Sequence, residues 1–252
     1  MSRPTNWCHS DQNPAYRGRM SSSPQSSVPE IHVAVDLIVL TLRGGELSVL
    51  LIQRDDEPHK GSWALPGGFI EYGEDLDGAA YRVLSDEASL GSGAVHLEQV
   101  RTFGAPGRDP RGHVVSVAFM ALGADLPDPL RGEDVADARW WSIADLDGIS
   151  LAFDHATVLE ASIERARSKL EYTTLAVTFL PEEFTISQLR GVYESVWGRS
   201  LDAGNFHRKA TRSEGFLVEL DRHAAPTGGR PARLYRAGSG TSLVPPLLRA
   251  GD

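Results

Sequence analysis

Residues 67–90, GGFIEYGEDLDGAAYRVLSDEASL, restrict the local fold more than any other stretch of this chain. The two glycines follow a strand-like run at residues 63–66, WALP, and allow the backbone to turn and approach its surroundings closely. Apolar positions after the glycines recur at helical spacing. Because residues three and four apart share a helix face, we expect Val83 to lie against Asp86 and Glu87. The segment therefore predicts a strand, a glycine loop and a helix with carboxylates on one face.

The spacing of the charged residues resembles the Nudix box, G-x5-E-x7-R-E-U-x-E-E-x-G-U with U apolar, whose carboxylates hold divalent metal against a diphosphate. The matching positions are Gly68, Glu74, Arg82, Leu84, Glu87 and Leu90. Three positions depart from the pattern: Val83 and Asp86 replace glutamates, and Ser89 replaces a glycine. The missing carboxylate at position 83 removes a metal ligand or a base for the attacking water. The resemblance thus implies a degenerate box in a protein that is not an enzyme or keeps only weak residual hydrolysis.

The resemblance also implies where a diphosphate would bind. The glycine loop and the box helix would contribute Gly67, Gly68, Glu74, Asp86 and Glu87. Guanidinium groups suit phosphate oxygens, and the arginines expected to supply them are Arg54, Arg101, Arg108 and Arg111. Because Mg²⁺ is usually held by one or two carboxylates together with phosphates, Asp86 and Glu87 are the expected metal ligands. The metal would bind together with an effector, meaning a ligand that regulates the protein, and no other cofactor is expected.

Length and composition limit the class of protein. A chain of 252 residues suits two domains of ordinary size. Its single cysteine, Cys8, excludes an intramolecular disulfide and fits a reducing compartment. No apolar run approaches the roughly 20 residues that a membrane span needs, and the N-terminus lacks the apolar core of a signal peptide. We therefore expect a cytoplasmic protein that does not associate with membranes.

Up to about residue 171 the sequence predicts mixed α and β structure. Residues 1–28 are rich in Ser, Pro, Asn and Gln and predict a disordered tail. Aliphatic and β-branched runs predict strands at residues 31–42, 47–54, 63–65, 96–104, 114–122 and 138–143. An apolar stripe predicts a second helix over residues 154–170. For residues 29–171 the Nudix resemblance implies an α/β (α+β) fold, arranged as an αβα sandwich.

After this region the pattern changes to that of a helix-turn-helix. The sequence TISQ, beginning at Thr185, has the form of a capping box, and apolar positions follow at helical spacing until Gly198. Asp202 is positioned to cap a second short helix. The runs FLVEL and RPARLYR, with two glycines between them, predict a β-hairpin. Residues 172–238 therefore predict a winged helix-turn-helix, and residues 239–252 a flexible tail.

The net charge of −9 argues against nucleic acid, but its distribution does not. Residues 199–236 carry a net +4, whereas the rest of the chain carries −13. Such asymmetry indicates a nucleic-acid-binding face; a solvated basic surface or a helical-hairpin oligomerisation module would show the same charges. The side chains expected to reach double-stranded DNA are Asn205, Arg208, Lys209, Arg212 and, beside the wing, Arg230.

The order of the two modules resembles the Nudix-related transcriptional regulators of NAD metabolism. The resemblance covers residues 30–236 and includes FTISQLRGVYESVWGRSLDAGNFHRKATRSEGF and GGRPARLYR. It implies a domain that senses ADP-ribose or a related nucleotide, and a homodimer that binds a palindromic operator. It also implies repression of NAD biosynthesis or salvage genes, with release of DNA when the effector binds. The helix over residues 154–170 and the linker at Tyr172 are the expected pivot.

Two other functions fit the same residues. If Asp86 and Glu87 suffice for catalysis, the chain is an active Nudix pyrophosphatase of nucleoside-diphosphate sugars with an accessory domain. Restoring glutamate at Val83 distinguishes the two, since the substitution would create or greatly raise magnesium-dependent hydrolysis in a sensor. The other alternative is a regulator of the same architecture that senses a sugar or a sugar phosphate, and the ligand preferred in calorimetry would identify it.

Overall fold

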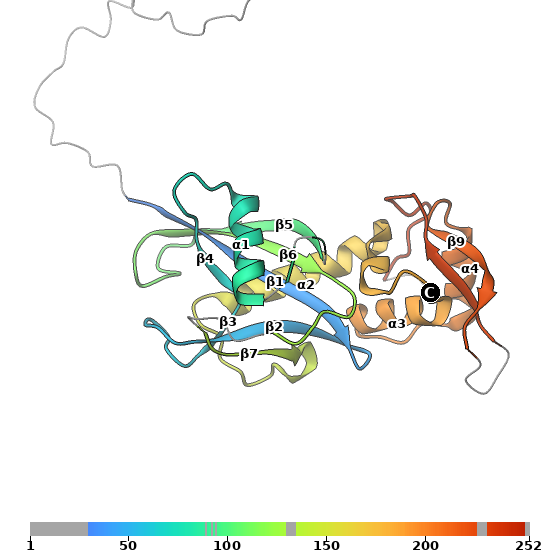
Figure 1. Ribbon diagram of the computed structural model, residues 1–252, viewed down its shortest axis with the longest axis horizontal. Coiled ribbons are helices and arrows are strands. Elements are labelled where there is room, and N and C mark those ends of the chain that lie inside the picture. Colours follow the sequence, from blue (N-terminus) through green and yellow to red (C-terminus); the bar gives the residue numbers. More distant parts are fainter. Residues whose placement is uncertain are drawn as a thin grey trace, which may run out of the picture. The chain divides into compact units, whose positions relative to one another are not determined.

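The computed structural model describes residues 30–88, 90–91, 93, 95–129, 135–225 and 231–249 (Figure 1). The tail expected at residues 1–28 and the expected DNA contact Arg230 lie outside the described residues. Within the described part, the strands form a seven-stranded mixed sheet and a separate three-stranded sheet, and the helices pack on them.

The large sheet is built around its longest strand, β1. Its strands are β1 (His32–Arg43), β2 (Glu46–Arg54), β3 (Trp63–Ala64), β4 (Gly67–Phe69), β5 (His96–Phe103), β6 (Val114–Leu122) and β7 (Val135–Ser142). β1 pairs in parallel with β6 and antiparallel with β2 and β4, while β3 and β7 pair with β2 and β5 pairs with β6. Because β1 is covered on both faces, it is predominantly apolar along its whole length instead of alternating with polar residues.

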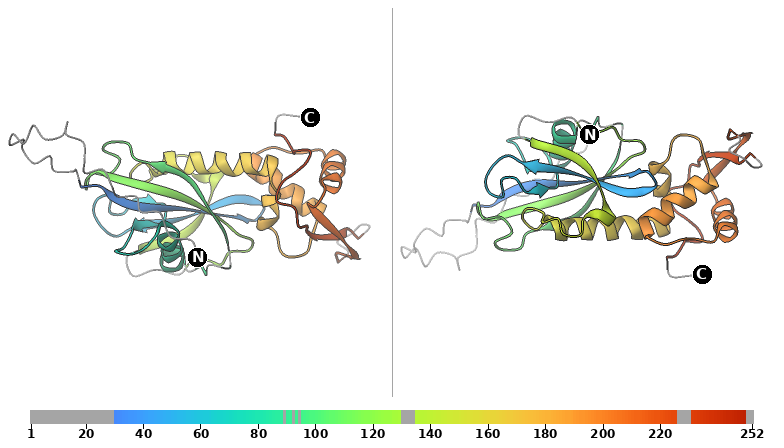
Figure 2. Two further views of the ribbon diagram at one scale, coloured as in Figure 1. Left: turned by 90° about the horizontal axis from the view of Figure 1, so that it is seen from above. Right: turned by 90° about the horizontal axis from the view of Figure 1, so that it is seen from below.

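Two helices, α1 (Leu76–Ala88) and α2 (His155–Tyr172), cover opposite faces of this sheet (Figure 2). On one face of β1, Val35, Leu37 and Val39 pack in the hydrophobic core that α1 covers. On the other face, Ile38 and Leu40 pack in the core that α2 covers. This division follows from the two-residue repeat of a strand. The predicted αβα sandwich is confirmed, and α2 corresponds to the helix expected over residues 154–170.

A helix-turn-helix with a β-hairpin follows. Its elements are β8 (Phe184–Thr185), α3 (Ile186–Trp197), α4 (Ala203–Arg212), β9 (Leu217–His223) and β10 (Arg233–Ala237). Thr185 caps α3 through the predicted capping box, and Gly198, with a φ of 67°, ends α3 in the left-handed region. The carboxylate of Asp202 accepts a hydrogen bond from Asn205 N over 2.7 Å and caps α4. The predicted winged helix-turn-helix is therefore confirmed, with β8 as an additional strand beside β10.

The segment after β10 differs from the flexible tail expected at residues 239–252. Leu243 and Leu247 are buried, and their backbone N–H groups donate to carbonyl groups of the last turn of α2. Arg249 forms ion pairs with two glutamates of α2. The burial of two leucines holds a segment whose Gly, Ser and Pro content by itself predicts mobility. We call residues 239–249 the C-terminal strap; residues 250–252 lie outside the described part.

Several short elements have no counterpart among the sequence predictions. The strands β4 and β8 are three and two residues long, too short to show a periodic pattern. The 3₁₀ helices η2 (Ile143–Asp145) and η3 (Thr174–Phe179) have three and six residues, respectively. None of the helices in the described ranges combines the length and the apolar character needed to cross a membrane.

Candidate ligand cavity and nucleic-acid interface

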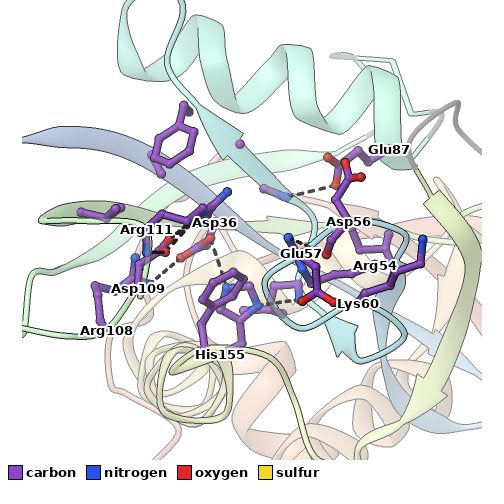
Figure 3. Close-up of a pocket in the computed structure, with 18 of the residues that line it drawn as sticks. Asp36, Arg54, Asp56, Glu57, Lys60, Glu87, Arg108, Asp109, Arg111 and His155 are labelled. Atoms are coloured by element: carbon purple, nitrogen blue, oxygen red, sulfur yellow. Dashed lines mark hydrogen bonds and ion pairs between the residues drawn. The ribbon is translucent and has the colours of Figure 1, made fainter.

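A cavity of about 650 Å³ lies where several segments of the sandwich meet (Figure 3). Its walls include the first half of β1, the end of β2 and the loop after it, the glycine loop of β4, the last turn of α1, the loop between β5 and β6, and the start of α2. The charged and polar side chains in the lining are Asp36, Arg54, Asp55, Asp56, Glu57, Lys60, Glu87, Arg108, Asp109, Arg111 and His155.

Six residues expected to bind ligand lie in this lining: Arg54, Gly67, Gly68, Glu87, Arg108 and Arg111. The lining does not include Glu74, Asp86 or Arg101. Arg101 is exposed on β5, with its guanidinium 5.3 Å from the ring of Phe103. The register of β5 on β6 shifts at this point, and such a bulge changes the direction in which side chains project. Strand alternation alone therefore does not place Arg101.

The box carboxylates do not converge. Two nitrogens of Arg82 donate to the carboxylate of Glu74, each over 2.9 Å, and these hydrogen bonds lower the pKa of Glu74. Asp86 is exposed on α1, whereas Val83 is 2% exposed and packs in the apolar core. In the described ranges no group of three or more His, Cys, Asp or Glu residues is arranged to hold a metal ion. Of the three box carboxylates, only Glu87 reaches the cavity.

The glycine loop lies close against strand β1 of the sheet. A side chain at Gly67 would place its Cβ 2.7 Å from the carbonyl oxygen of Val35 and 2.8 Å from the carboxylate of Asp36. At Gly68 the nearest atom would be a methyl group of Val83 at 3.7 Å, an ordinary contact. Gly67 is thus required where β4 pairs with β1, and this is the close backbone approach that the two glycines predict.

Glu87 gives the cavity a carboxyl group that ionises near neutral pH. Its carboxylate accepts a hydrogen bond from Gly67 N over 3.1 Å. Burial raises the pKa of Glu87 to about 7; the Gly67 hydrogen bond opposes this rise, and Asp86 adds to it. The lining holds four cationic side chains and six carboxylates, so it is net negative when all are ionised. Protonation of Glu87 reduces that excess.

Two of the cavity arginines differ in how they are held. Arg54 Nε donates to the carbonyl of Pro58 over 2.9 Å. Among the residues that the structure describes, Arg54 forms no ion pair with a carboxylate. Arg111 binds both oxygens of Asp109, the shortest contact being 2.7 Å. Both guanidinium groups lie against the ring of Phe153, at 4.9 Å for Arg54 and 5.3 Å for Arg111. Arg54 is therefore the cavity arginine with the weakest internal competition for an anion.

Arg108 forms the most extensive ion-pair network of the cavity, and Figure 3 labels it together with its partner Asp36. It donates to both oxygens of Asp154, over 3.0 and 2.7 Å, and to Asp36 over 3.1 Å. Asp36 also accepts from the hydroxyl of Ser116 over 2.6 Å. His155 Nδ1 accepts from Leu65 N over 2.9 Å, and burial lowers the pKa of His155. The network joins the centre of the sheet to the start of α2.

Sequence reasoning did not identify Asp36, Phe153 or Asp154 as parts of a site. A detectable pattern existed for Asp36 alone, because a carboxylate in the middle of an aliphatic strand requires a buried partner. Phe153 and Asp154 belong to the loop before α2, and the distance of Asp154 from Arg108 in sequence, 46 residues, hides their pairing. His155, which is buried, bonded to Leu65 N and 3.6 Å from a carboxylate oxygen of Asp36, supports the framework of the site.

The exposed face of α4 carries two of the side chains predicted to contact DNA, Arg208 and Arg212. Phe206 and Ala210 are buried, so α4 presents its opposite face to solvent. Arg208 and Arg212 are exposed on that face, and Arg208 donates to the side-chain oxygen of Asn205 over 2.7 Å. Lys209 is half-buried beside the C-terminal strap. The helix therefore presents an arginine-rich surface.

A second hollow lies between the two helices and the hairpin. It has a volume of about 350 Å³ and is lined by side chains of α3, α4 and β10, among them Arg190, His207 and Arg233. Arg233 pairs with Glu219 across the hairpin over 3.1 Å, and Arg222 pairs with Glu183. The wing thus carries basic side chains that are already anchored to the domain. None of these was among the predicted DNA contacts.

Two family models match the chain. Residues 30–162 match the NUDIX domain, and residues 176–237 match the NrtR DNA-binding winged helix domain. The ADPR responsive transcriptional repressor NtrR of Acinetobacter baylyi is 34% identical over 214 residues, which cover 84% of each chain.

Two solved structures are similar to the whole chain and to its first domain, respectively. Shewanella oneidensis NrtR complexed with a 27mer DNA is 30% identical with a TM-score of 0.73, over 86% of this chain and 99% of that one. The NUDIX domain of Shewanella oneidensis NrtR complexed with ADP ribose is 33% identical with a TM-score of 0.52, over 57% of this chain and 94% of that one. The chain therefore belongs to the NrtR family, in which a NUDIX domain is followed by a DNA-binding winged helix.

Proposed function

We propose that the protein is a DNA-binding transcriptional repressor whose NUDIX domain senses ADP-ribose or a related nucleotide and releases DNA when this effector binds. One observation carries the proposal: a single chain holds an arginine-containing cavity and a winged helix, and α2 extends from the one toward the other. The match to the ADPR responsive repressor of Acinetobacter baylyi supports it. Because ADP-ribose is NAD without its nicotinamide, genes of NAD biosynthesis or salvage are the proposed targets.

The cavity has the size and chemistry for the effector. Its volume of about 650 Å³ lies within the range of ordinary ligand sites, roughly 300–1,000 Å³. The residues proposed to bind the effector are Arg54, Gly67, Gly68, Glu87, Arg108 and Arg111. Arg54 would bind the diphosphate most directly, since it has no carboxylate partner in the described part of the chain.

Magnesium is proposed as an optional companion of the effector. The cavity lining has an excess of carboxylates, which disfavours a bare diphosphate. With Glu87 as the box carboxylate in the cavity, the cation would share its coordination between protein and phosphate oxygens. We expect ADP-ribose to bind in the presence of EDTA and to bind more tightly with Mg²⁺. Complete loss of binding in EDTA would show that the metal is essential.

The winged helix is proposed to bind a palindromic operator as part of a homodimer. In helix-turn-helix proteins the second helix enters the major groove, and this places α4 against base edges. Arg208 and Arg212 are exposed for bases or phosphates, while Asn205 and Lys209 would support them. Arg208→Ala should abolish operator binding and leave effector binding unchanged. Arg165→Ala, an exposed arginine of α2, is the matched control.

Catalysis is proposed to be absent or weak, because Val83 fills the position of a box glutamate. Val83→Glu should create or strongly raise magnesium-dependent hydrolysis of ADP-ribose, measured as release of AMP. Since position 83 is buried, the same change should cost about 1–3 kcal/mol of stability. Val83→Gln controls for this cost without supplying a carboxylate. Brisk turnover by the unaltered protein would make it a pyrophosphatase.

Selection of bound duplexes from a random DNA pool, with and without ADP-ribose and Mg²⁺, tests the whole proposal. The expected result is an enriched palindrome that ADP-ribose removes. Enrichment that ignores ADP-ribose but responds to a pentose phosphate would identify a sugar-phosphate sensor of the same architecture. No enrichment by the unaltered protein at modest salt would refute the regulator and favour the hydrolase.

A further inference from the structure

The helix α2 begins in the wall of the ligand cavity. Phe153, Asp154 and His155 are consecutive, and Phe153 and His155 line the cavity. Asp154 is the N-cap residue of α2, and Phe153 has a φ of 54°, in a region that L-residues other than glycine rarely adopt. The surrounding contacts, including the guanidinium groups of Arg54 and Arg111 against the Phe153 ring, hold this conformation. The start of α2 is therefore shaped by the cavity.

The other end of α2 holds the winged helix. Arg167 Nε donates to the carbonyl of Val196 over 2.9 Å, and Trp197 Nε1 donates to the carbonyl of Arg167 over 3.1 Å. The C-terminal strap binds the last turn of the same helix. With 18 residues, α2 is about 27 Å long at 1.5 Å per residue. A shift at its first turn would therefore reach α3 through these contacts.

The carboxylate of Asp154 has two competing uses. It binds Arg108 through both oxygens, and it makes no hydrogen bond to the N–H groups of the first turn of α2. Aspartate is among the preferred N-cap residues, since its carboxylate can accept from those N–H groups. One carboxylate can therefore stabilise either the ion pair with Arg108 or the start of α2.

We propose that this competition at Asp154 couples the cavity to the winged helix: an anionic ligand takes Arg108 from Asp154, which then caps α2 and changes the position of that helix. The inference rests on the proposed function and adds the device that links effector to DNA. Arg108 is the arginine through which a ligand would act on α2, because it lines the cavity and its guanidinium bridges Asp154 and Asp36. Its side chain is 5% exposed, so it has little contact with bulk solvent. Asp154 is the partner released, because it is 24% exposed, whereas Asp36 is 8% exposed and is also bound by Ser116.

Two substitutions at Asp154 should act in opposite directions. Asp154→Asn keeps a good N-cap residue but cannot form the ion pair, so it favours the released state. We expect its operator affinity without effector to fall about tenfold, a typical allosteric coupling, and its affinity for ADP-ribose to rise by the same factor. Asp154→Glu keeps the charge but is a poor N-cap residue, so it favours the paired state. It should hold the operator at ADP-ribose concentrations that release the unaltered protein.

Asp147→Asn provides the matched control. Asp147 is exposed in the segment between β7 and α2, and it forms no ion pair with the residues that the structure describes. The substitution removes one carboxylate seven residues before Asp154 and leaves the ion pair of Asp154 with Arg108 in place. Its operator affinity and its release by ADP-ribose should equal those of the unaltered protein, and a change as large as that of Asp154→Asn would contradict the proposal.

Operator affinity by fluorescence anisotropy and ADP-ribose affinity by calorimetry, with thermal unfolding as the check on folding, complete the test. If the unaltered protein binds its operator and releases it with ADP-ribose, the proposed function stands independently of the Asp154 variants. Equal release by the unaltered protein and by both Asp154 variants would overturn the coupling inference alone. Losses in the same direction for Asn and Glu would also overturn it, since a merely structural role predicts that result.

Discussion

At the scale of single residues, Glu87 determines how the cavity responds to pH. Its carboxylate is held against the glycine loop, and burial raises its pKa to about 7 from the ordinary 4.5. Below about pH 4.5 the group is protonated in both the folded and the unfolded protein and has no effect. Between pH 4.5 and 7 the unfolded protein ionises first, so the folded protein is progressively disfavoured. Above pH 7 the penalty is complete.

Glu87→Gln should therefore stabilise the protein at alkaline pH. We expect the free energy of unfolding to rise by about 1–3 kcal/mol at pH 8, and to change little at pH 4.5, because the glutamine oxygen keeps the hydrogen bond to Gly67 N. Urea unfolding at the two pH values measures the difference. Asp86→Asn, which alters an exposed carboxylate next to it, should change stability by less than about 0.5 kcal/mol. A pH-independent effect of Glu87→Gln would contradict the buried-carboxylate account.

Sequence spacing identified the residues of the cavity better than their roles. The resemblance implied Gly67 and Glu87 as ligand-binding residues, and both line the cavity. It did not show that Gly67 is required by the backbone of β1, because that contact is made with a strand about thirty residues earlier. The face of a helix also decides more than spacing does: Asp86 follows Val83 by three residues, yet Val83 is in the core and Asp86 is exposed. Spacing defines neighbours, and tertiary packing decides which of them meet a ligand.

At the scale of secondary-structure elements, the C-terminal strap stabilises the junction between α2 and the winged helix. Leu243 is 3% exposed and its neighbour Val244 is 73% exposed, so the two provide a matched pair. Leu243→Ala should lower the free energy of unfolding by about 2–4 kcal/mol, since it deletes buried methyl groups and leaves a cavity. Val244→Ala should change it by less than about 0.5 kcal/mol. If chemical denaturation showed that Leu243→Ala and Val244→Ala lower the free energy of unfolding by similarly small amounts, the strap would not be held on α2.

Elements with a local cause were predictable, and those with a distant cause were not. The start of α3 follows from the capping box at Thr185, and its end from Gly198. The strap and the strand β4 have no such local pattern, because their stability comes from α2 and β1, respectively. The composition of residues 239–249 predicts mobility, and only the position of the two leucines opposite α2 reverses that expectation.

At the scale of the whole molecule, charge is separated along the chain. The net −9 conceals a segment of +4 in residues 199–236, and the exposed face of α4 lies within this segment. DNA binding by this face must overcome repulsion between DNA and the acidic remainder of the protein. The ligand cavity, which belongs to that remainder, is itself rich in carboxylates. Under the proposed function, this distribution would confine the DNA contact to the winged helix and keep the effector site apart from it.

A homodimer would place two copies of α4 in successive turns of the major groove, and this geometry makes the proposed operator sensitive to spacing. Half-sites of helix-turn-helix dimers lie about 10 base pairs apart or at multiples of that distance. Inserting about five base pairs between the half-sites rotates one of them by half a turn, so a rigid dimer can contact only one. Operator affinity should then fall to that of an isolated half-site, whereas inserting a full turn should restore part of it if the dimer tolerates the longer span. Equal affinity for all spacings, together with a monomeric mass in solution, would contradict a dimer and leave each winged helix to bind alone.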